Sequence, residues 1–273
     1  MKRWVFIGKS DKRDLLLYLS SALTAAGRSV LLADATEGGK YRYSIGEVQQ
    51  LLPVTEFCGF DVAAGPLDMR LLHNAADGND GKGVKDYDYE LVDLEALHAA
   101  SPDIFASADE LVLVTSFDRY EVESTARWLR GLVNMRPELR GMRVRPVFTR
   151  TVDSYLSTDY ILGFMDDIGI QWHEEEIIIP WNELNQAVQL ENEHGRRLAM
   201  SRLSRSYKRA LRRLLSGLAG FEAGAAKKRC AARKGDAHEQ GYVLGSRAWV
   251  CGKRSRGLRR HRRPPLSAAR TAV

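Results

Sequence analysis

The sequence predicts an α/β protein built on a three-layer, doubly wound and mostly parallel sheet. Strand-like and helix-like segments alternate along residues 1–221, as they do where helices cover both faces of a parallel sheet. Most strand-like runs are short, rich in Val, Ile and Leu, and free of polar alternation, which is typical of strands buried on both faces. A chain of 273 residues is also long enough to bury a core of this size.

The order of elements follows from hydrophobic periodicity. In the first helix, apolar residues recur at Leu15, Leu16, Leu19 and Leu23, and Gly27 follows as a C-cap. Right-handed crossovers between the strands then complete the doubly wound arrangement. The expected strands are Arg3–Ile7, Ser29–Ala33, Phe60–Ala64, Glu90–Asp93, Leu111–Thr115, Arg143–Phe148 and Glu176–Ile179. The expected helices between them are Asp14–Ala26, Arg119–Met135, Thr158–Ile168 and Asn182–Leu190.

Charge divides the chain into a body and a tail. Residues 222–273 contain 14 Lys and Arg against 3 Asp and Glu, a net charge of +11, whereas residues 1–221 carry −5. The tail has no apolar periodicity that could offset the entropy of ordering, so we expect one folded domain over 1–221 and a basic, disordered tail over 222–273. The tail has three interpretations: a nucleic-acid arm, a linker, or the translation of a shifted reading frame. Residues 75–85 are expected to form a flexible surface loop.

Several classes of protein are excluded by composition. No run of 18 apolar residues is present, so no transmembrane segment is expected. Cys58, Cys230 and Cys251 are scattered, which argues against a disulfide framework or zinc site and for a cytoplasmic location. The acidic body offers no electrostatic footprint for nucleic acid, so no specific nucleic-acid partner is expected.

One segment, Ser201–Leu218, has the pattern of an amphipathic basic helix. Its apolar spacing suits either a helix that binds a membrane surface or the last helix of the core, and we favour the core.

Residues 88–115 carry the most informative pattern. An apolar run ends in Asp93, and Ala108-Asp109-Glu110 leads into the strand Leu111–Thr115. This order resembles the Walker B region of the ParA/MinD-type P-loop ATPases. The resemblance continues in order over about residues 3–218: LLADAT at 31–36 resembles the family's LLIDAD, and IIIPWNE at 177–183 resembles its IPYDE turn.

The resemblance implies a P-loop NTPase-like fold and a nucleotide pocket. Carried over by position, that pocket consists of Gly8, Lys9, Ser10, Asp34, Asp93, Thr149 and Pro180. Ser10 and Asp93 would hold Mg²⁺ if the protein is active. ATP with Mg²⁺, or no cofactor at all, are equally compatible with the sequence.

The same resemblance fails at the positions that carry the family's chemistry. A phosphate loop needs glycines for close backbone approach, a Lys for the β/γ oxygens and a Ser or Thr for Mg²⁺. The family reads K-G-G-x-G-K-[ST], whereas residues 8–14 read GKSDKRD. Either Gly8-Lys9-Ser10 is a G-K-S end without the upstream glycines, or Gly8-Lys9 is the front of a loop that is about two residues short and lacks the second Lys and the hydroxyl. In both alignments two of the loop's three functions are lost. Thr36 replaces a carboxylate that positions the attacking water, and Thr149 replaces the Asn that reads adenine. Asp11 and Asp14 either cap the first helix and complement its dipole or repel phosphate.

A further cluster, residues 40–44 (KYRYS), follows the second strand. We expect an exposed loop there, which either clamps an anion or partner or is ordinary amphipathic surface.

Three functions are consistent with these observations. The first is a degenerate, non-hydrolysing ParA/MinD-like protein, a pseudo-ATPase that acts as a localisation or assembly partner in partitioning, division-site placement, or pilus and secretion positioning. It would have a protein partner and could form a homodimer. The second is an active Mg-ATP-dependent ATPase with a remodelled loop that uses Lys9, Ser10 and Asp93. The third is a nucleic-acid-binding module that uses the tail.

Overall fold

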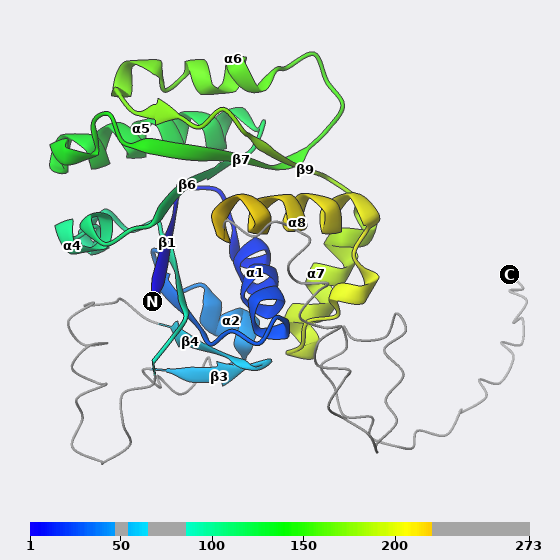
Figure 1. Ribbon diagram of the computed structural model, residues 1–273. Helices are drawn as coiled ribbons and strands as arrows, with labels where there is room; N and C mark the ends of the chain where they lie inside the picture. The colour runs from blue at the N-terminus through cyan, green and yellow to red at the C-terminus, as the bar shows by residue number, and fades with distance from the viewer. Residues whose placement is uncertain (47–53, 65–85, 220–273) are drawn as a thin grey trace, which may run out of the picture.

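The computed structural model describes residues 1–46, 54–64 and 86–219 (Figure 1). The expected loop at 75–85 and the expected disordered tail at 222–273 lie outside these described residues, so both remain predictions.

A largely parallel sheet, with nine strands among the residues described, forms the middle of the protein. Its order is β3-β4-β2-β5-β1-β6-β7-β8, with β9 pairing with β7 as well. All described pairings are parallel except the β3–β4 hairpin. The strands are β1 (Lys2–Ile7), β2 (Val30–Ala35), β3 (Thr55–Phe57), β4 (Phe60–Ala64), β5 (Tyr89–Leu94), β6 (Glu110–Thr115), β7 (Arg143–Thr151), β8 (Gln171–Trp172) and β9 (Ile177–Pro180).

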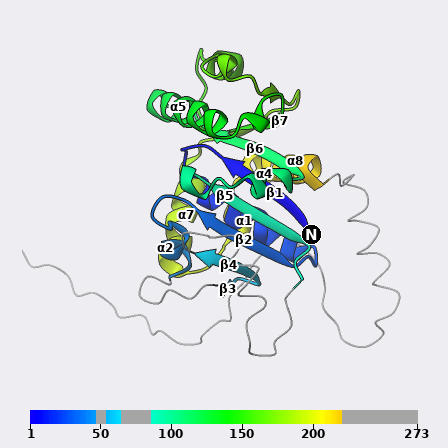
Figure 2. The ribbon, with the colours of Figure 1, turned by 90° about the vertical axis from the view of Figure 1, so that its left-hand side faces the viewer.

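Helices cover both faces of this sheet. The α-helices are α1 (Arg13–Ala25), α2 (Tyr41–Ile45), α4 (Pro102–Ala106), α5 (Arg119–Met135), α6 (Thr158–Gly163), α7 (Glu183–Gly195) and α8 (Arg205–Ala219). Short 3-10 turns occupy Leu97–Ala99, Pro137–Leu139, Asp166–Ile168 and Met200–Arg202. Figures 1 and 2 show α5 and α6 on the side of the sheet opposite α1 and α8. The three-layer, doubly wound prediction is therefore confirmed.

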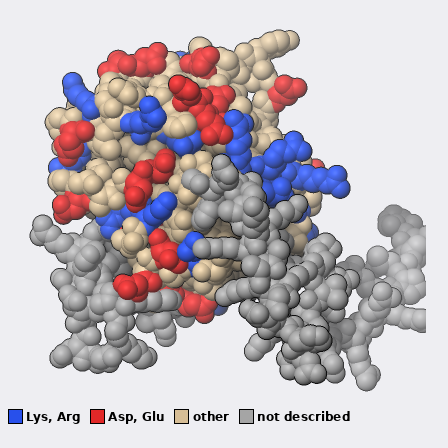
Figure 3. Space-filling model, viewed as in Figure 1, with Lys and Arg blue, Asp and Glu red and all other residues tan. Residues whose placement is uncertain are grey.

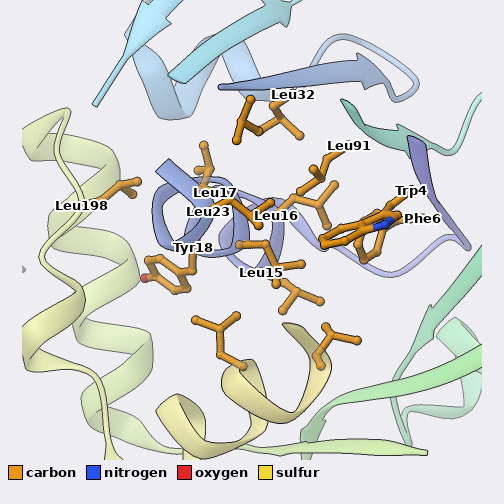
Figure 4. Packing of buried hydrophobic residues seen from close by; sticks show 14 of the residues in the cluster. Trp4, Phe6, Leu15, Leu16, Leu17, Tyr18, Leu23, Leu32, Leu91 and Leu198 are labelled. Atoms are coloured by element: carbon orange, nitrogen blue, oxygen red, sulfur yellow. The ribbon is translucent and has the colours of Figure 1, made fainter. Parts of the chain in front are cut away.

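The two faces of β1 explain how the layers are held together. Trp4 and Phe6 point into the core shared with α1, α7 and α8, as Figure 4 shows for the residues around α1. Val5 and Ile7 point into the second core, with α4, α5 and α6. Because successive side chains of a strand alternate between faces, the four successive apolar residues 4–7 of this central strand serve both cores.

A buried ion pair explains why a charged residue, Glu90, lies inside the buried strand β5. Arg3 of β1 lies opposite Glu90 of β5 in the parallel register. Arg3 Nε donates to Glu90 Oε2 at 2.6 Å, and both side chains are buried. The backbone N–H of Arg3 donates to Asp109, so the start of β1 is tied to the segments that begin both neighbouring strands.

The last helix packs as a core element. The apolar side of α8, including Tyr207, Leu211 and Leu214, is buried against the sheet, so the membrane-surface interpretation of this helix is not supported. Within the described residues, no helix is long and apolar enough to cross a membrane.

Two local expectations were wrong. Residues 41–45 form helix α2 rather than an exposed loop, and Tyr41 is completely buried. The helix expected at 158–168 ends at Gly163, and a 3-10 turn follows it.

Candidate functional site

The loop between β1 and α1 lies at the point where the strand order reverses. The chain leaves β1 toward β2 on one side, returns to β5 next to β1, and continues to β6 on the other side. In open α/β sheets, ligands bind in the crevice at the carboxyl ends of the strands at such a switch point. Gly8 opens this loop with φ +119°, and a Cβ atom there would lie 2.4 Å from the carbonyl oxygen of Val114. Only glycine fits this position.

A buried lysine fills the interior of this loop. Lys12, the N-cap residue of α1, is 1% exposed. Its Nζ donates to the carbonyl oxygen of Gly8 at 2.9 Å and lies 2.7 Å from Oδ1 of Asp93 at the end of β5. The other oxygen of Asp93 accepts from the hydroxyl of Tyr41 at 2.9 Å. Burial raises the pKa of Asp93, and Lys12 and Tyr41 partly offset that effect. The charged groups of Lys12 and Asp93 are therefore paired with each other inside the protein, and Tyr41 of α2 donates the hydrogen bond to the second oxygen of Asp93.

The second lysine of the loop faces outward. Lys9 Nζ lies 3.1 Å from Glu37 and 3.2 Å from Glu95. Glu95 is buried directly after β5 and also accepts from Lys40 at 2.5 Å. The two carboxylates thus neutralise both lysines at the mouth of the loop.

Ser10 is directed away from Asp93. Its Oγ donates to Glu121 of α5 at 2.6 Å, and Arg150 at the end of β7 donates to the same carboxylate at 2.6 and 2.8 Å. Arg150 adopts a left-handed backbone, with φ 52°, which is uncommon for a residue other than glycine. The loop is therefore linked to α5 and β7 through Glu121.

At the end of β2, a hydroxyl and a carboxylate form a local turn. Asp34 accepts from Thr36 Oγ1 at 2.5 Å and from the backbone N–H of Tyr41 at 3.0 Å. Thr36 Oγ1 in turn accepts from the N–H of Lys40. Both side chains serve to anchor the chain entering α2.

The last two predicted pocket residues lie on neighbouring strands away from this loop. Thr149 is buried in β7 and donates to the carbonyl oxygen of Thr115. Pro180 ends β9 opposite Thr151. Among the described residues, neither has a hydrogen bond to the β1–α1 loop.

Two carboxylates at the start of α1 differ in environment. Arg13 lies in bidentate contact with Asp11 and, against the effect of burial, holds the pKa of Asp11 below its usual value. Burial, helped by the nearby Asp11, raises the pKa of Asp14, whose carboxylate accepts from Tyr207 of α8. Asp11 also accepts from the backbone N–H of Arg13, but it precedes the N-cap residue, Lys12, which makes no side-chain cap bond, so the predicted capping role falls one residue away from Asp11.

The partners of these side chains show whether they are free to bind Mg-ATP. A metal at this site needs a free carboxylate oxygen and a hydroxyl, and a phosphate needs an unpaired ammonium group. Lys12 and Tyr41 already hold the two oxygens of Asp93, and Ser10 is committed to Glu121. Lys9 is paired with two glutamates. The arrangement does not fit Mg-ATP without displacement of at least one of these pairs.

Comparison with known proteins gives a consistent picture of the fold. No family model and no curated protein sequence matches this chain. Among solved structures, it is similar to the MinC:MinD cell division complex of Aquifex aeolicus, with TM-score 0.54 and 17% identity over 79% of this chain and 96% of that one. The chain has the MinD/ParA-type P-loop fold. The ATP complex of a Cyanothece McdA variant matches with TM-score 0.52 and 15% identity, over 81% of this chain and 97% of that one. A putative plasmid partition protein of Borrelia burgdorferi bound to AMPPNP matches with TM-score 0.51 and 13% identity, over 79% and 97%.

Within this MinD/ParA-type fold, sequence reasoning missed the residues that fill the site. Lys12, Tyr41, Glu95 and Glu121 were not among the predicted pocket residues, yet each makes a contact with a residue that was. One signal was available for Lys12. A cation at a helix N-terminus is unfavourable beside the helix dipole, so its presence at the start of α1 indicates a carboxylate partner.

Proposed function

We propose that this chain is a non-hydrolysing protein of the MinD/ParA-type fold that acts as a localisation or assembly partner for another protein. The observation that carries this proposal is the buried pair between Lys12 and Asp93, with Nζ 2.7 Å from Oδ1. It places a lysine ammonium group where a metal-bound nucleotide would have to meet the carboxylate at the end of β5.

Two further features support the same conclusion. Hydrolysis of a phosphoanhydride relies on positioning water and on stabilising charge that develops in the transition state. The side chain of Thr36 has no carboxylate that could orient the attacking water, and its hydroxyl donates a hydrogen bond to Asp34. Ser10 donates to Glu121 rather than facing Asp93. The sheet and its switch point are thus retained while the groups needed for turnover are engaged in structural contacts.

A second candidate, a Mg-ATP-dependent ATPase with a remodelled loop, rests on one observation. Lys12 lies at the loop end, and its ammonium group faces the loop carbonyl oxygens of Gly8 and Ser10. If phosphate displaced Asp93 from this lysine, Asp93 would become free to bind a metal. This candidate requires the ion pair to open when nucleotide binds.

Calorimetric titration of the full chain with ATP, with and without Mg²⁺, separates the two. We expect no heat of binding at millimolar nucleotide and no phosphate release above the blank. Micromolar, Mg²⁺-dependent binding, together with turnover that Asp93→Ala or Lys12→Ala abolishes, would establish the second candidate. Lys2→Ala is the matched control, because Lys2 is exposed at the start of β1, at the opposite end of that strand from the loop.

The localisation role has an independent test. A fluorescent fusion of the full chain in the source cells should adopt a discrete distribution, and Lys12→Ala should alter it only to the extent that it lowers the amount of folded protein. A uniform distribution of a stable, full-length fusion would contradict the proposed role.

A further inference from the structure

Charge in the C-terminal part of the folded body is separated into two consecutive blocks of opposite sign. Residues 151–195 contain 10 Asp and Glu and no Lys or Arg, and residues 196–219 contain 8 Lys and Arg and no Asp or Glu. Protein surfaces ordinarily intersperse both signs. A surface that gathers one sign raises the local concentration of oppositely charged partners.

The basic block presents a row of arginines on α8. Arg205, Arg209 and Arg212 are exposed at positions i, i+4 and i+7, which fall on one side of a helix. The opposite side of α8 is buried in the core. Figure 3 shows the corresponding concentration of blue side chains at the right of the molecule, where α8 begins. We call these three residues the arginine face.

The acidic block is exposed on another layer of the fold. Asp153 in the β7–α6 loop, Asp159 in α6 and Asp166 in the following 3-10 turn are exposed, and we call them the acidic end. Helix α6 packs into the core with α5, whereas α8 packs into the core on the other side of the sheet. The sheet therefore separates the acidic end from the arginine face within one molecule.

Some residues of the acidic block form ion pairs with residues of the basic block within the same molecule. Arg202 contacts Glu191, and Arg213 Nε lies 2.8 Å from Glu175. Among the described residues, no ion pair joins any member of the arginine face or of the acidic end to another side chain. Within the described part of the chain, each surface thus carries exposed charge that has no oppositely charged side chain at ion-pair distance.

We propose that the arginine face of α8 is a docking surface for a second copy of this chain, which contributes its acidic end. Because the two surfaces are different, the contact is heterologous, and each bound copy leaves one arginine face and one acidic end open for a further copy. The contact uses neither the β1–α1 loop nor any nucleotide, so it does not depend on the proposed function. Charge complementarity of this kind fixes register and speeds encounter, and salt weakens it.

The test uses two charge-reversal variants of the full chain. One carries Arg205→Glu, Arg209→Glu and Arg212→Glu, and the other carries Asp153→Lys, Asp159→Lys and Asp166→Lys. A third variant with Arg127→Glu, Arg140→Glu and Arg143→Glu changes the same number of exposed arginines elsewhere and is the matched control. Circular dichroism and thermal midpoints establish that all are folded, and light scattering coupled to sedimentation gives their mass.

We expect the wild type and the control to associate at about 50 mM salt, with the apparent association constant falling at least about tenfold at about 500 mM. Each reversal variant alone should be monomeric. A one-to-one mixture of the two should recover association, because the unchanged acidic end of one variant meets the unchanged arginine face of the other, and the two reversed surfaces are also opposite in charge.

Three results would overturn the proposal. The first is a wild type that stays monomeric at low salt up to about 0.2 mM. The second is an arginine variant that associates as strongly as the wild type, because the tail or another basic surface would then bind the second copy. The third is an absence of self-association together with binding of a random 20-base-pair duplex that the arginine variant loses, which would make the face a nucleic-acid site.

Discussion

Nζ of Lys12 lies 2.7 Å from Oδ1 of Asp93, and each side chain is 1% exposed. The interior of the loop after β1 is therefore filled by the side chain of Lys12, the N-cap residue of α1. A charge this deeply buried is tolerated only when it is paired and its remaining hydrogen-bonding capacity is met. Here Gly8, Ser10 and Tyr41 supply the additional contacts.

Removal of one partner of this pair should destabilise the protein strongly. Lys12→Met leaves Asp93 buried without its cation, which costs about 3–5 kcal/mol in the free energy of unfolding. Lys12→Met with Asp93→Leu should recover much of that loss, because no buried charge is left. Denaturant titration measures all three. Lys40→Met is the matched control and should cost no more than about 1 kcal/mol, since Lys40 is partly exposed and Lys9 still faces Glu95. A Lys12→Met protein as stable as the control would refute the structural role of the pair.

The backbone at Gly8 should not tolerate a side chain. Gly8→Ala places Cβ 2.4 Å from the carbonyl oxygen of Val114 and forces a non-glycine residue to φ +119°. We expect a loss of about 3 kcal/mol or more in the free energy of unfolding. Gly27→Ala is the comparison, because φ is +78° there but nothing lies within 4 Å. It should cost only about 1–2 kcal/mol. Equal losses for the two variants would show that the clash at Gly8 is relieved by movement of β6.

Ionisation of Asp14 should lower the free energy of unfolding as pH rises above the pKa that this carboxyl group has in the unfolded chain. Burial raises the pKa of Asp14 in the folded state, so that state holds the proton more tightly than the unfolded chain does. Stability is then lost as pH rises from about 3.8 through the folded pKa. Asp14→Asn removes this loss while its amide oxygen still accepts from Tyr207. The variant should be more stable than the wild type at pH 7, and the difference should vanish at low pH.

Removal of the basic tail should leave the folded body unchanged. A chain that ends at Phe221 keeps α8 and loses only a segment without apolar periodicity. Thermal midpoints of the full and shortened proteins should agree within about 1 °C. A drop of several degrees, or loss of soluble protein, would mean that the tail packs onto the body.

The scaffold could be predicted from the sequence because its signals are local. The strand Phe60–Ala64 and the helix Arg119–Met135 have the bounds expected from periodicity. The edge strands β3 and β8 were missed, since runs of three and two residues carry no periodic signal. Helix α2 was missed for a related reason: five residues that include Arg42 and directly follow Lys40 look solvent-exposed unless the partner of Tyr41 is known.

The interior of the candidate site could not be predicted in the same way. Lys9 precedes Ser10 in a superficially phosphate-binding order, so local sequence points to Lys9, whereas the structure places Lys12 beside Asp93. The choice between the two lysines depends on which one faces Asp93, and these residues are 81 or more positions apart in sequence. Contacts at that separation are set by strand order, which periodicity does not reveal.

The place of β1 between β5 and β6 bears on how the protein is synthesised. Its partners in the sheet are Tyr89–Leu94 on one side and Glu110–Leu113 on the other. Among the described strands, β1 is thus the one separated from its partners by the longest stretch of chain, and Trp4 and Phe6 lack their final packing until that stretch has been synthesised. At about 5–20 residues per second, the wait lasts on the order of 5–20 s. Slow translation or a truncated message would therefore leave the apolar residues of β1 unpaired, and nascent chains that end before Leu113 should be the most dependent on chaperones.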